Sequence, residues 1–373
     1  MKYIWLSVSP YAPTGYGTVT KNIVPRLVKA GNEVCIATKH ENAGTVIWNG
    51  VKVICGMDVG SLNRMIDRGE YDYIFSLLDA HALPSIPNKW ISYTPFDAME
   101  CPDSIAKYLP NMKLILALTK HGQESFKKRG YKSIYVPHGV DKNIFNINTE
   151  ARKLAREANG YTDKNFVAGI IAINYTDERK GMIELLQAFA TFYRKHNNAR
   201  LYLGTSTTDP TGAWRIPEIL KSLGLSHVVI LPDEDKYFNG AVTDDEIANY
   251  YRMMDVFVMP TKGEGFGLPL IECQACGTPL ITTNASTGPE LLRGGSLIEL
   301  GQYDYEWFNN GWRPRPNPQA ILNELEKAYS QWESNQLASI GEQASKLIID
   351  EYDWDVVWEK QWRPLLDAIN YLY

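Results

Sequence analysis

Two glutamates stand at a spacing that suits chemistry on a phosphorylated ligand. Glu264 and Glu272 belong to the segment PTKGEGFGLPLIECQACGTPLI, where a Gly-Phe-Gly-Leu-Pro turn separates them. The apolar residues after the turn predict that a loop enters a helix here. The bare amides of Gly265 and Gly267 at the mouth of that helix could meet phosphate oxygens, with help from the helix dipole.

The two carboxylates would have different tasks. Inside the helix, Glu272 could accept hydrogen bonds from paired hydroxyls such as those of a ribose. Before the turn, Glu264 would face the reacting group. The alternative is a strand-to-helix turn flanked by two solvated glutamates. The spacing of the carboxylates, together with the apolar helix, favours the functional interpretation.

A pair of cations precedes another predicted helix. Arg179 and Lys180 lie in the segment DERKGMIELLQAF. An exposed basic pair at a helix N-terminus would be opposed by the helix dipole, and this cost favours a functional role. A departing diphosphate gains negative charge in the transition state, and a positioned Arg and Lys could neutralise that charge without a bound metal.

These motifs together resemble a known family. An E-x7-E motif after a strand is similar to the signature of the large retaining glycosyltransferase family that includes glycogen and sucrose synthases, the glycosyl transferases group 1 or family 4-like enzymes. The resemblance implies the α/β GT-B fold, with two facing Rossmann-like, doubly wound domains and an interdomain cleft. It also implies a UDP or GDP sugar as donor substrate and no required cofactor or metal.

The resemblance assigns roles to individual residues. Glu264 would lie near the donor sugar, and Arg179 with Lys180 would stabilise the leaving diphosphate. These three are the candidate catalytic residues. The candidate donor-binding residues are Gly15, Tyr16, Gly17, Gly265, Phe266, Gly267, Leu268 and Glu272.

The chain departs from the family pattern in two places. The family has an Arg about five residues before the Lys, whereas this chain has Tyr175 there and an Arg adjacent to the Lys. Many relatives carry a histidine after the strand that corresponds to KWISYTP, whereas this chain has Asp97 in YTPFDAMEC. Asp97 is a candidate for an acceptor or sugar hydroxyl, and its alternative role is an Asx-type turn.

The first strand and helix are joined by a glycine loop. The segment SPYAPTGYGTVTKNIVPRL has Gly15 and Gly17 there, and the family has a glycine loop that faces the donor phosphates. The segment fails as a dinucleotide fingerprint because the third glycine would fall at Thr20. A nicotinamide enzyme is therefore a weak alternative.

Two histidines are further candidates. His138 lies in VPHGVD, which resembles the P-N/H-G-V-D stretch with which such enzymes leave the first domain, and it is a candidate acceptor or sugar contact. A capped turn is an equal alternative. His81 in LLDAHALP follows a predicted strand and could line the cleft, although a lone histidine is more often simply hydrogen-bonded.

The elements that must position these residues alternate regularly. Short β-branched and aromatic runs alternate with amphipathic stretches, which indicates two mainly parallel, doubly wound sheets. We expect an acceptor-side domain over residues 1–155 and a nucleotide-sugar-binding domain over 156–354. The last helix, 355–373, would pack back on the first domain. The proline-rich and tryptophan-rich stretch 303–319 is expected to be an ordered loop.

Composition narrows the class of protein. The 373 residues are 45% hydrophobic with a formal net charge of -5, so the chain can form two cores and has no global basic field for nucleic acid. Of the five cysteines only Cys273 and Cys276 are close together, in a C-x-x-C without a second metal-type pair, and we expect this pair to be buried small residues in a reducing compartment. No signal-peptide core or membrane span is present, which predicts a cytoplasmic protein.

A basic segment leaves two kinds of surface contact as alternatives. The basic face over 120–132 could contact an anionic lipid or a phosphorylated acceptor. The favoured alternative is that this face is simply solvated. Peripheral membrane contact therefore stays an alternative. The sequence indicates no oligomeric state.

The sequence thus predicts a retaining transfer of a hexose-type sugar from a nucleoside-diphosphate sugar to an acceptor hydroxyl on a glycan, a lipid or a small molecule. No pattern in VVILPDEDKYFNGAVTDDE distinguishes the donor base. Two alternatives are a nucleotide-sugar epimerase of the same fold and a non-catalytic nucleotide-sugar-binding module.

Overall fold

The computed structural model describes residues 1–39, 42–79, 89–174, 178–207, 214–233, 236, 242–306 and 311–372. It divides into two compact units, each of which is described by itself. Unit 1 comprises Met1–Gly139, Glu306–Gly311 and Trp354–Tyr373. Unit 2 comprises Val140–Tyr305 and Trp312–Asp353.

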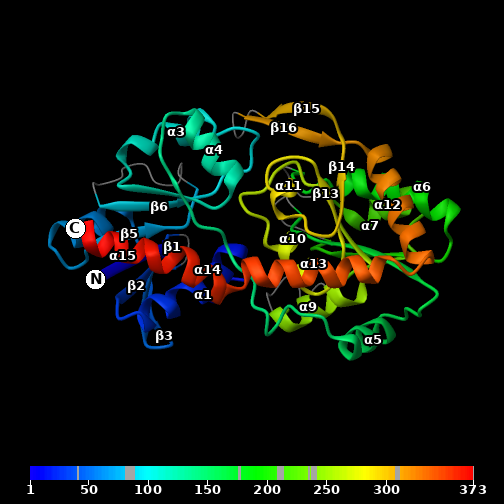
Figure 1. Ribbon diagram of the computed structural model, residues 1–373, viewed down its shortest axis with the longest axis horizontal. Helices are drawn as coiled ribbons and strands as arrows, with labels where there is room; N and C mark the ends of the chain where they lie inside the picture. The colour runs from blue at the N-terminus through cyan, green and yellow to red at the C-terminus, as the bar shows by residue number, and fades with distance from the viewer. Residues whose placement is uncertain are drawn as a thin grey trace. The chain divides into compact units, whose positions relative to one another are not determined.

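Unit 1 is built on one sheet with the strand order β3-β4-β2-β1-β5-β6-β7-β8, in which β3 is the antiparallel strand (Figure 1). The strands are β1 (Lys2–Ser7), β2 (Glu33–Thr38), β3 (Gly44–Trp48), β4 (Val51–Cys55), β5 (Tyr73–Ser76), β6 (Trp90–Thr94), β7 (Leu114–Ala117) and β8 (Ile134–Tyr135). The helices are α1 (Gly15–Lys29), α2 (Val59–Asp67), α3 (Asp103–Ala106), η2 (Leu109–Asn111), α4 (Lys120–Lys128), α14 (Trp354–Val357), η3 (Trp358–Trp362) and α15 (Arg363–Leu372). Central strands such as β1 are continuous apolar runs because helices cover both faces of a parallel sheet.

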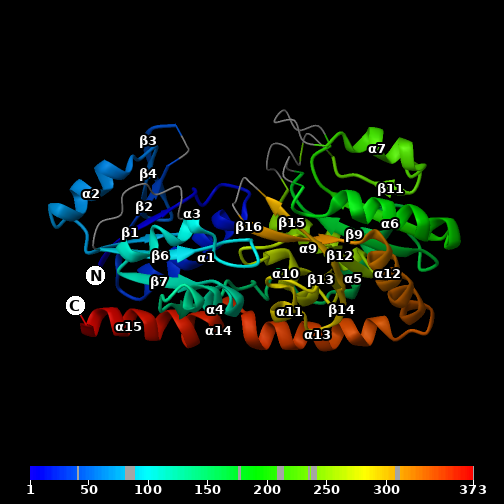
Figure 2. The ribbon, with the colours of Figure 1, turned by 90° about the horizontal axis from the view of Figure 1, so that it is seen from above.

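The C-terminal helical segment belongs to unit 1. Its Trp362 is fully buried, and its ring lies 6.0 Å from that of Trp5, 5.9 Å from that of Phe75 and 5.6 Å from that of Tyr93. Those three partners come from three neighbouring strands of the sheet. Figures 1 and 2 draw α14 and α15 in red beside these strands. The Trp362 side chain therefore packs the C-terminal segment against the sheet of unit 1.

Unit 2 has a second sheet with the order β11-β10-β9-β12-β13-β14, and each neighbouring pair of its strands is parallel. Its strands are β9 (Phe166–Ile171), β10 (Ala199–Gly204), β11 (Val229–Ile230), β12 (Val256–Met259), β13 (Leu280–Thr283) and β14 (Gly295–Ile298). Its helices are α5 (Thr149–Ala158), α6 (Met182–Lys195), α7 (Ile216–Leu223), α9 (Asp244–Met253), α10 (Leu268–Ala275), α11 (Gly288–Leu291), α12 (Pro318–Glu333) and α13 (Leu337–Tyr352). Because every pair is parallel, the carboxyl ends of these strands lie at one edge.

Unit 2 begins earlier in the chain than residue 156, where the sequence placed the boundary. The polar stretch that suggested a linker forms α5, capped by Asn148 and packed against α9. Arg156 is almost fully buried and its Nη1 lies 3.2 Å from Asp255 Oδ2, while Arg152 pairs with the other oxygen of that carboxylate. Buried ion pairs thus attach the polar helix to unit 2.

The stretch that we expected to be a loop is a β-hairpin, so this prediction was wrong. Strands β15 (Leu300–Glu306) and β16 (Gly311–Pro316) form a separate two-stranded sheet, and α12 follows (Figure 2). Prolines are tolerated there because both strands of such a ribbon are edge strands. Among the described residues, no helix is both long and apolar enough to cross a membrane.

Candidate functional site

The candidate catalytic residues of unit 2 meet at the carboxyl edge of its sheet. Arg179 and Lys180 follow β9, Glu264 follows β12, and Ser286 follows β13. These strands are neighbours in the order β9-β12-β13, which brings loops from distant parts of the sequence together. An open parallel sheet binds its ligands at this edge.

The Glu264 carboxylate is the point on which the cations converge. Its Oε1 lies 2.6 Å from Lys180 Nζ and 3.2 Å from Arg179 Nη1. Thr261 Oγ1 donates a hydrogen bond of 2.8 Å to the same oxygen. All three charged side chains are largely buried, with 7% of the Glu264 side chain exposed against 17% for Arg179 and 13% for Lys180.

The electrostatic setting keeps Glu264 ionised. Burial alone would raise the pKa of this carboxyl, but the charges of Lys180 and Arg179 outweigh burial and lower the pKa to about 2. The site therefore contains one fixed anion beside two cations. This trio has a surplus positive charge, which suits a phosphorylated ligand.

The loop that carries Arg179 and Lys180, called the cation loop, is tied through its backbone to the loop after β12. Lys262 N donates to Arg179 O over 2.7 Å, and Arg179 Nη1 donates to Gly263 O over 2.8 Å. Ser286 Oγ donates to Glu264 O over 3.1 Å and so adds the loop after β13. These contacts hold the three loops together, and so hold the charged side chains in place at the carboxyl edge of the sheet.

Gly181 allows the two loops to approach each other. It is the N-cap of α6 and has a left-handed backbone with φ 64°. A Cβ at this position would lie 2.1 Å from Pro260 O, so only glycine fits without a shift of the backbone. The close approach brings Lys180, one residue before, over the end of β12.

The second glutamate lies inside α10 as expected. Gly267 is the N-cap of that helix, with φ 97°. Glu272 is only 9% exposed, and Tyr251 Oη donates a hydrogen bond of 3.1 Å to its Oε2. Phe266 and Leu268 are buried, so in this structure they pack the turn, while Gly265 is half-buried.

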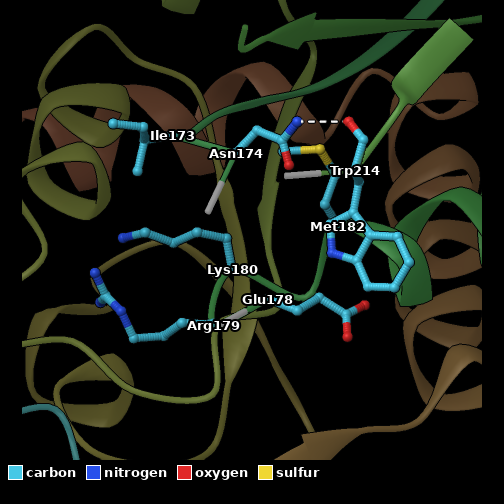
Figure 3. A pocket seen from close by; sticks show the side chains of 7 residues that line it. All are labelled: Ile173, Asn174, Glu178, Arg179, Lys180, Met182 and Trp214. Atoms are coloured by element: carbon cyan, nitrogen blue, oxygen red, sulfur yellow. Dashed lines mark hydrogen bonds between the residues drawn. The ribbon is translucent and has the colours of Figure 1, made fainter. Parts of the chain in front are cut away.

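A small pocket adjoins the cations (Figure 3). Its lining comprises Ile173, Asn174, Glu178, Arg179, Lys180, Met182 and Trp214. In Figure 3 the side chains of Arg179 and Lys180 extend the same way, and Glu178 extends the opposite way. Asn174 Nδ2 donates to Trp214 O over 2.8 Å and closes one wall.

Glu178 is an acid of different character from Glu264. Burial, then the nearby carboxylate of Glu184, raises its pKa to about 7, and Lys262 acts in the opposite direction. Lys262 Nζ lies 3.7 Å from Glu178 Oε2. Carboxylates of low and high pKa thus flank the cation pair.

The remaining candidates belong to unit 1. Thr14 caps α1 by accepting a hydrogen bond from Gly17 N, and a Cβ on Gly17 would lie 2.2 Å from Ala12 O, so this glycine allows a tight turn. Tyr16 Oη lies 3.5 Å from Asp79 Oδ1, and Gly15 is the first residue of the helix.

Asp97 and His138 differ in accessibility. Asp97 is half-buried at the end of β6. His138 is 3% exposed, with its ring 5.2 Å from that of Tyr93, and burial lowers its pKa to about 3, so the ring is neutral at ordinary pH. His81 and Tyr175 lie outside the described residues.

Sequence reasoning missed several polar partners. Thr261 and Ser286 bind Glu264, and Tyr251 binds Glu272, yet none of the three was singled out. A threonine three residues before the first glutamate, directly after a buried strand, is the signal that could have indicated Thr261. Ser286 and Tyr251 depend on tertiary contacts. All five cysteines are free, and Cys273 and Cys276 are buried as expected.

Comparisons with known proteins relate part of this chain to glycosyltransferases. Residues 167–330 match the family model described as Glycosyl transferases group 1. Over 156 residues the chain is 32% identical to mannosylfructose-phosphate synthase of Agrobacterium fabrum. This alignment covers 40% of this chain and 32% of that protein. Over 229 residues it is 26% identical to an uncharacterised glycosyltransferase of Methanocaldococcus jannaschii. This second alignment covers 60% of this chain and 50% of that protein. The alignments thus span half or less of these relatives.

Solved structures resemble the whole chain. Sucrose-phosphate synthase from Thermosynechococcus elongatus has a TM-score of 0.77 at 14% identity, covering 99% of this chain and 100% of that one. The Anabaena protein HepE in complex with UDP-glucose has a TM-score of 0.73 at 16% identity, covering 98% and 100%. These likenesses show the fold. Through residues 167–330 of its second unit, the chain is therefore similar to the glycosyl transferases group 1 family, and it has the GT-B fold.

Proposed function

We propose that this protein transfers a hexose-type sugar from a nucleoside-diphosphate sugar to an acceptor hydroxyl, with retention of the anomeric configuration. The observation that carries the proposal is the convergence of Lys180 and Arg179 on Glu264 at the carboxyl edge of unit 2. Two cations held by one carboxylate suit a ligand whose negative charge increases as it departs. The segment that matches the family contains all three residues.

The proposed mechanism stabilises the leaving group. Arg179 and Lys180 neutralise the departing diphosphate, Glu264 orients the sugar, and the acceptor attacks from the face that the diphosphate leaves. No covalent intermediate on the enzyme is invoked, and we propose that side-chain cations supply the charge without a metal. Activity in the presence of EDTA tests this last point.

The donor base is proposed by analogy. The related HepE structures contain UDP, UDP-glucose, or UDP with glucose, which supports a uridine nucleotide as the first ligand to test. Glu272 is proposed to bind the ribose because its carboxylate is held by Tyr251 in the middle of the short helix α10. Acceptors are proposed to be glycans, lipids or small molecules that carry a free hydroxyl.

Thermal unfolding with UDP, GDP, ADP and NAD tests the proposal directly. A ligand that binds only the native state raises the midpoint, by the equivalent of about 2.7 kcal/mol at a hundred times its Kd. We expect one nucleoside diphosphate to do so, and Lys180→Gln to weaken its binding at least about tenfold. The matched control is Lys195→Gln, a surface lysine with 58% exposure paired to Glu326.

The outcomes separate the possible functions. Stabilisation by NAD alone would overturn the proposal. Turnover of the donor without acceptor into an isomeric nucleotide sugar would indicate an epimerase, and binding without transfer to a broad acceptor panel would indicate a non-catalytic module. The anomeric configuration of a transferred sugar, read from proton NMR couplings, tests retention.

A further inference from the structure

The β15–β16 hairpin exposes three large aromatic rings. Tyr303 is 47% exposed, Tyr305 54% and Trp312 56%. Tyr305 and Trp312 meet edge to face, with ring centroids 5.3 Å apart. A cluster of exposed aromatic rings, unlike a single one, indicates a surface that contacts a partner.

The hairpin holds this surface in a defined orientation. Side chains two positions apart point to the same side of a strand, so Tyr303 and Tyr305 share one face. Asp304 lies between them on the opposite face, where both of its oxygens lie 2.7 Å from Arg315 of β16. A bidentate ion pair thus links the two strands behind the aromatic face.

The hairpin is continuous with the candidate site. Strand β15 begins two residues after β14, which pairs in parallel with β13, so the hairpin departs from the same sheet edge as the loop of Ser286 and Glu264. On the polar face, the charge of Arg315 interacts with those of Glu184 and Glu178, and Glu178 lines the pocket beside Arg179. Figures 1 and 2 draw β15 and β16 beside the larger sheet of unit 2.

The chemistry of the face favours an uncharged, hydroxylated ligand. The neighbouring charges of Asp304 and Arg315 cancel within their ion pair, and Glu306 adds an acid, so the hairpin lacks the basic cluster that an anionic membrane requires. Tyr and Trp rings have an apolar body with a polar tip. A sugar ring is complementary, because its C–H groups form an apolar face and its hydroxyls form a polar rim.

We propose that Tyr303, Tyr305 and Trp312 form a binding platform for a neutral oligosaccharide, which is the acceptor chain. The proposal rests on the proposed function, since it names the acceptor class for that site. Sugar units remote from the reacting hydroxyl would stack on the rings and so hold the acceptor beside the donor pocket.

Affinity electrophoresis of the full chain through gels that contain α-glucan, α-mannan, β-glucan or chitooligosaccharide conjugates tests the platform. We expect the wild type to be retarded by at least one of these glycans. Trp312→Ala and Tyr305→Ala should each weaken that binding about tenfold, as the loss of an aromatic contact implies. Trp312→Phe should retain part of the affinity because a ring remains. The control, Tyr371→Ala, removes a ring that is 92% exposed elsewhere and should leave binding unchanged.

Nucleoside-diphosphate stabilisation of the same variants separates this proposal from the proposed function. Platform variants should bind the nucleotide as the wild type does, with equal thermal midpoints in its absence. Glycan binding that is lost only in the platform variants supports the platform even where no nucleotide binds, and that result would refute the proposed function alone. The platform is refuted if no glycan retards the wild type, if Trp312→Ala binds normally, or if vesicles of phosphatidylglycerol bind in its place.

Discussion

Lys180 Nζ lies 2.6 Å from Glu264 Oε1, although the two residues are 84 positions apart in the chain. Arg179 contacts the same oxygen, so one carboxylate holds two cations in place. A bound diphosphate would therefore meet cations that are already positioned, and the free energy needed to order them is spent during folding. The same carboxylate is thus expected to affect both stability and binding.

Replacing Glu264 by Gln should separate these two effects. The variant leaves Lys180 and Arg179 largely buried without their anion, and the loss of one partner of a buried pair costs about 3 kcal/mol. Urea unfolding should reveal this loss. A nucleoside diphosphate should stabilise the variant more than the wild type because the cations gain a new anionic partner, while sugar transfer falls.

The matched control for this variant is Glu218→Gln. Glu218 is 68% exposed and pairs with Arg215 on the surface, so its removal should change the free energy of unfolding by less than about 0.5 kcal/mol. Loss of nucleotide binding in Glu264→Gln would contradict the view that the cations, and not the carboxylate, bind the diphosphate.

The pH dependence of stability should carry the signature of Glu264. Its pKa is lowered from 4.5 to about 2 in the folded protein because Lys180 and Arg179 outweigh burial. A lowered pKa contributes stability that is present above pH 4.5 and is lost as the pH falls toward 2. Urea unfolding between pH 3 and pH 6 should show that Glu264→Gln depends less steeply on pH than the wild type. An equal pH dependence of the unfolding free energy in the variant and the wild type would contradict the view that the charge of Glu264 causes this dependence.

Glu272 offers a test of ribose recognition. Glu272→Gln keeps the size of the side chain and a partner for Tyr251 Oη, which lies 3.1 Å from the carboxylate in the wild type. If the carboxylate accepts hydrogen bonds from ribose hydroxyls, nucleoside diphosphates should bind about tenfold more weakly, since hydrogen bonds to charged groups are worth about 1.5–3 kcal/mol. Inorganic pyrophosphate, which has no ribose, should bind as it does to the wild type.

Calorimetric titration of both ligands measures the difference. A 2′-deoxynucleoside diphosphate provides a second comparison, because its affinity should respond less to the substitution. Equal weakening of pyrophosphate and nucleotide would mean that Glu272 acts on the whole loop and not on the ribose.

The sequence predicted the doubly wound architecture because strand and helix periods alternate clearly along both units. It also singled out Glu264, Arg179 and Lys180, which the structure brings into contact, since charged residues beside glycine turns after buried strands are local signals. It failed where tertiary contacts decide. Helix α5 looked like a linker because its stabilising partner, Asp255, lies far along the chain.

The hairpin was missed for a related reason. Two prolines and a tryptophan in β16 break the usual strand pattern, and the ion pair that joins the two strands links Asp304 to Arg315, 11 positions away. Helix α13 was also not predicted, and its Ser345 side chain, buried against α10, donates to Ala275 O over 2.7 Å. Long-range partners of this kind leave no periodic signal in the sequence.

Gly181→Ala, which adds one methyl group, should lower the free energy of unfolding more than any other such change in the cation loop. The backbone there has φ 64°, and the added Cβ would lie 2.1 Å from Pro260 O, so either α6 or the end of β12 must move. We expect a loss of more than about 2 kcal/mol, since a left-handed residue costs about 1 kcal/mol before any clash. The shift would also displace Lys180, so nucleotide binding should weaken with stability.

Gly224→Ala is the matched control for that substitution. Gly224 has φ 72° at the end of α7, but a Cβ there would meet nothing within 4 Å. Both variants introduce the same backbone strain, and the difference between their free energies of unfolding therefore isolates the clash with Pro260. Gly224→Ala should lose only about 1 kcal/mol and bind nucleotide normally. Equal losses in the two variants would mean that the close approach of α6 to β12 does not position Lys180.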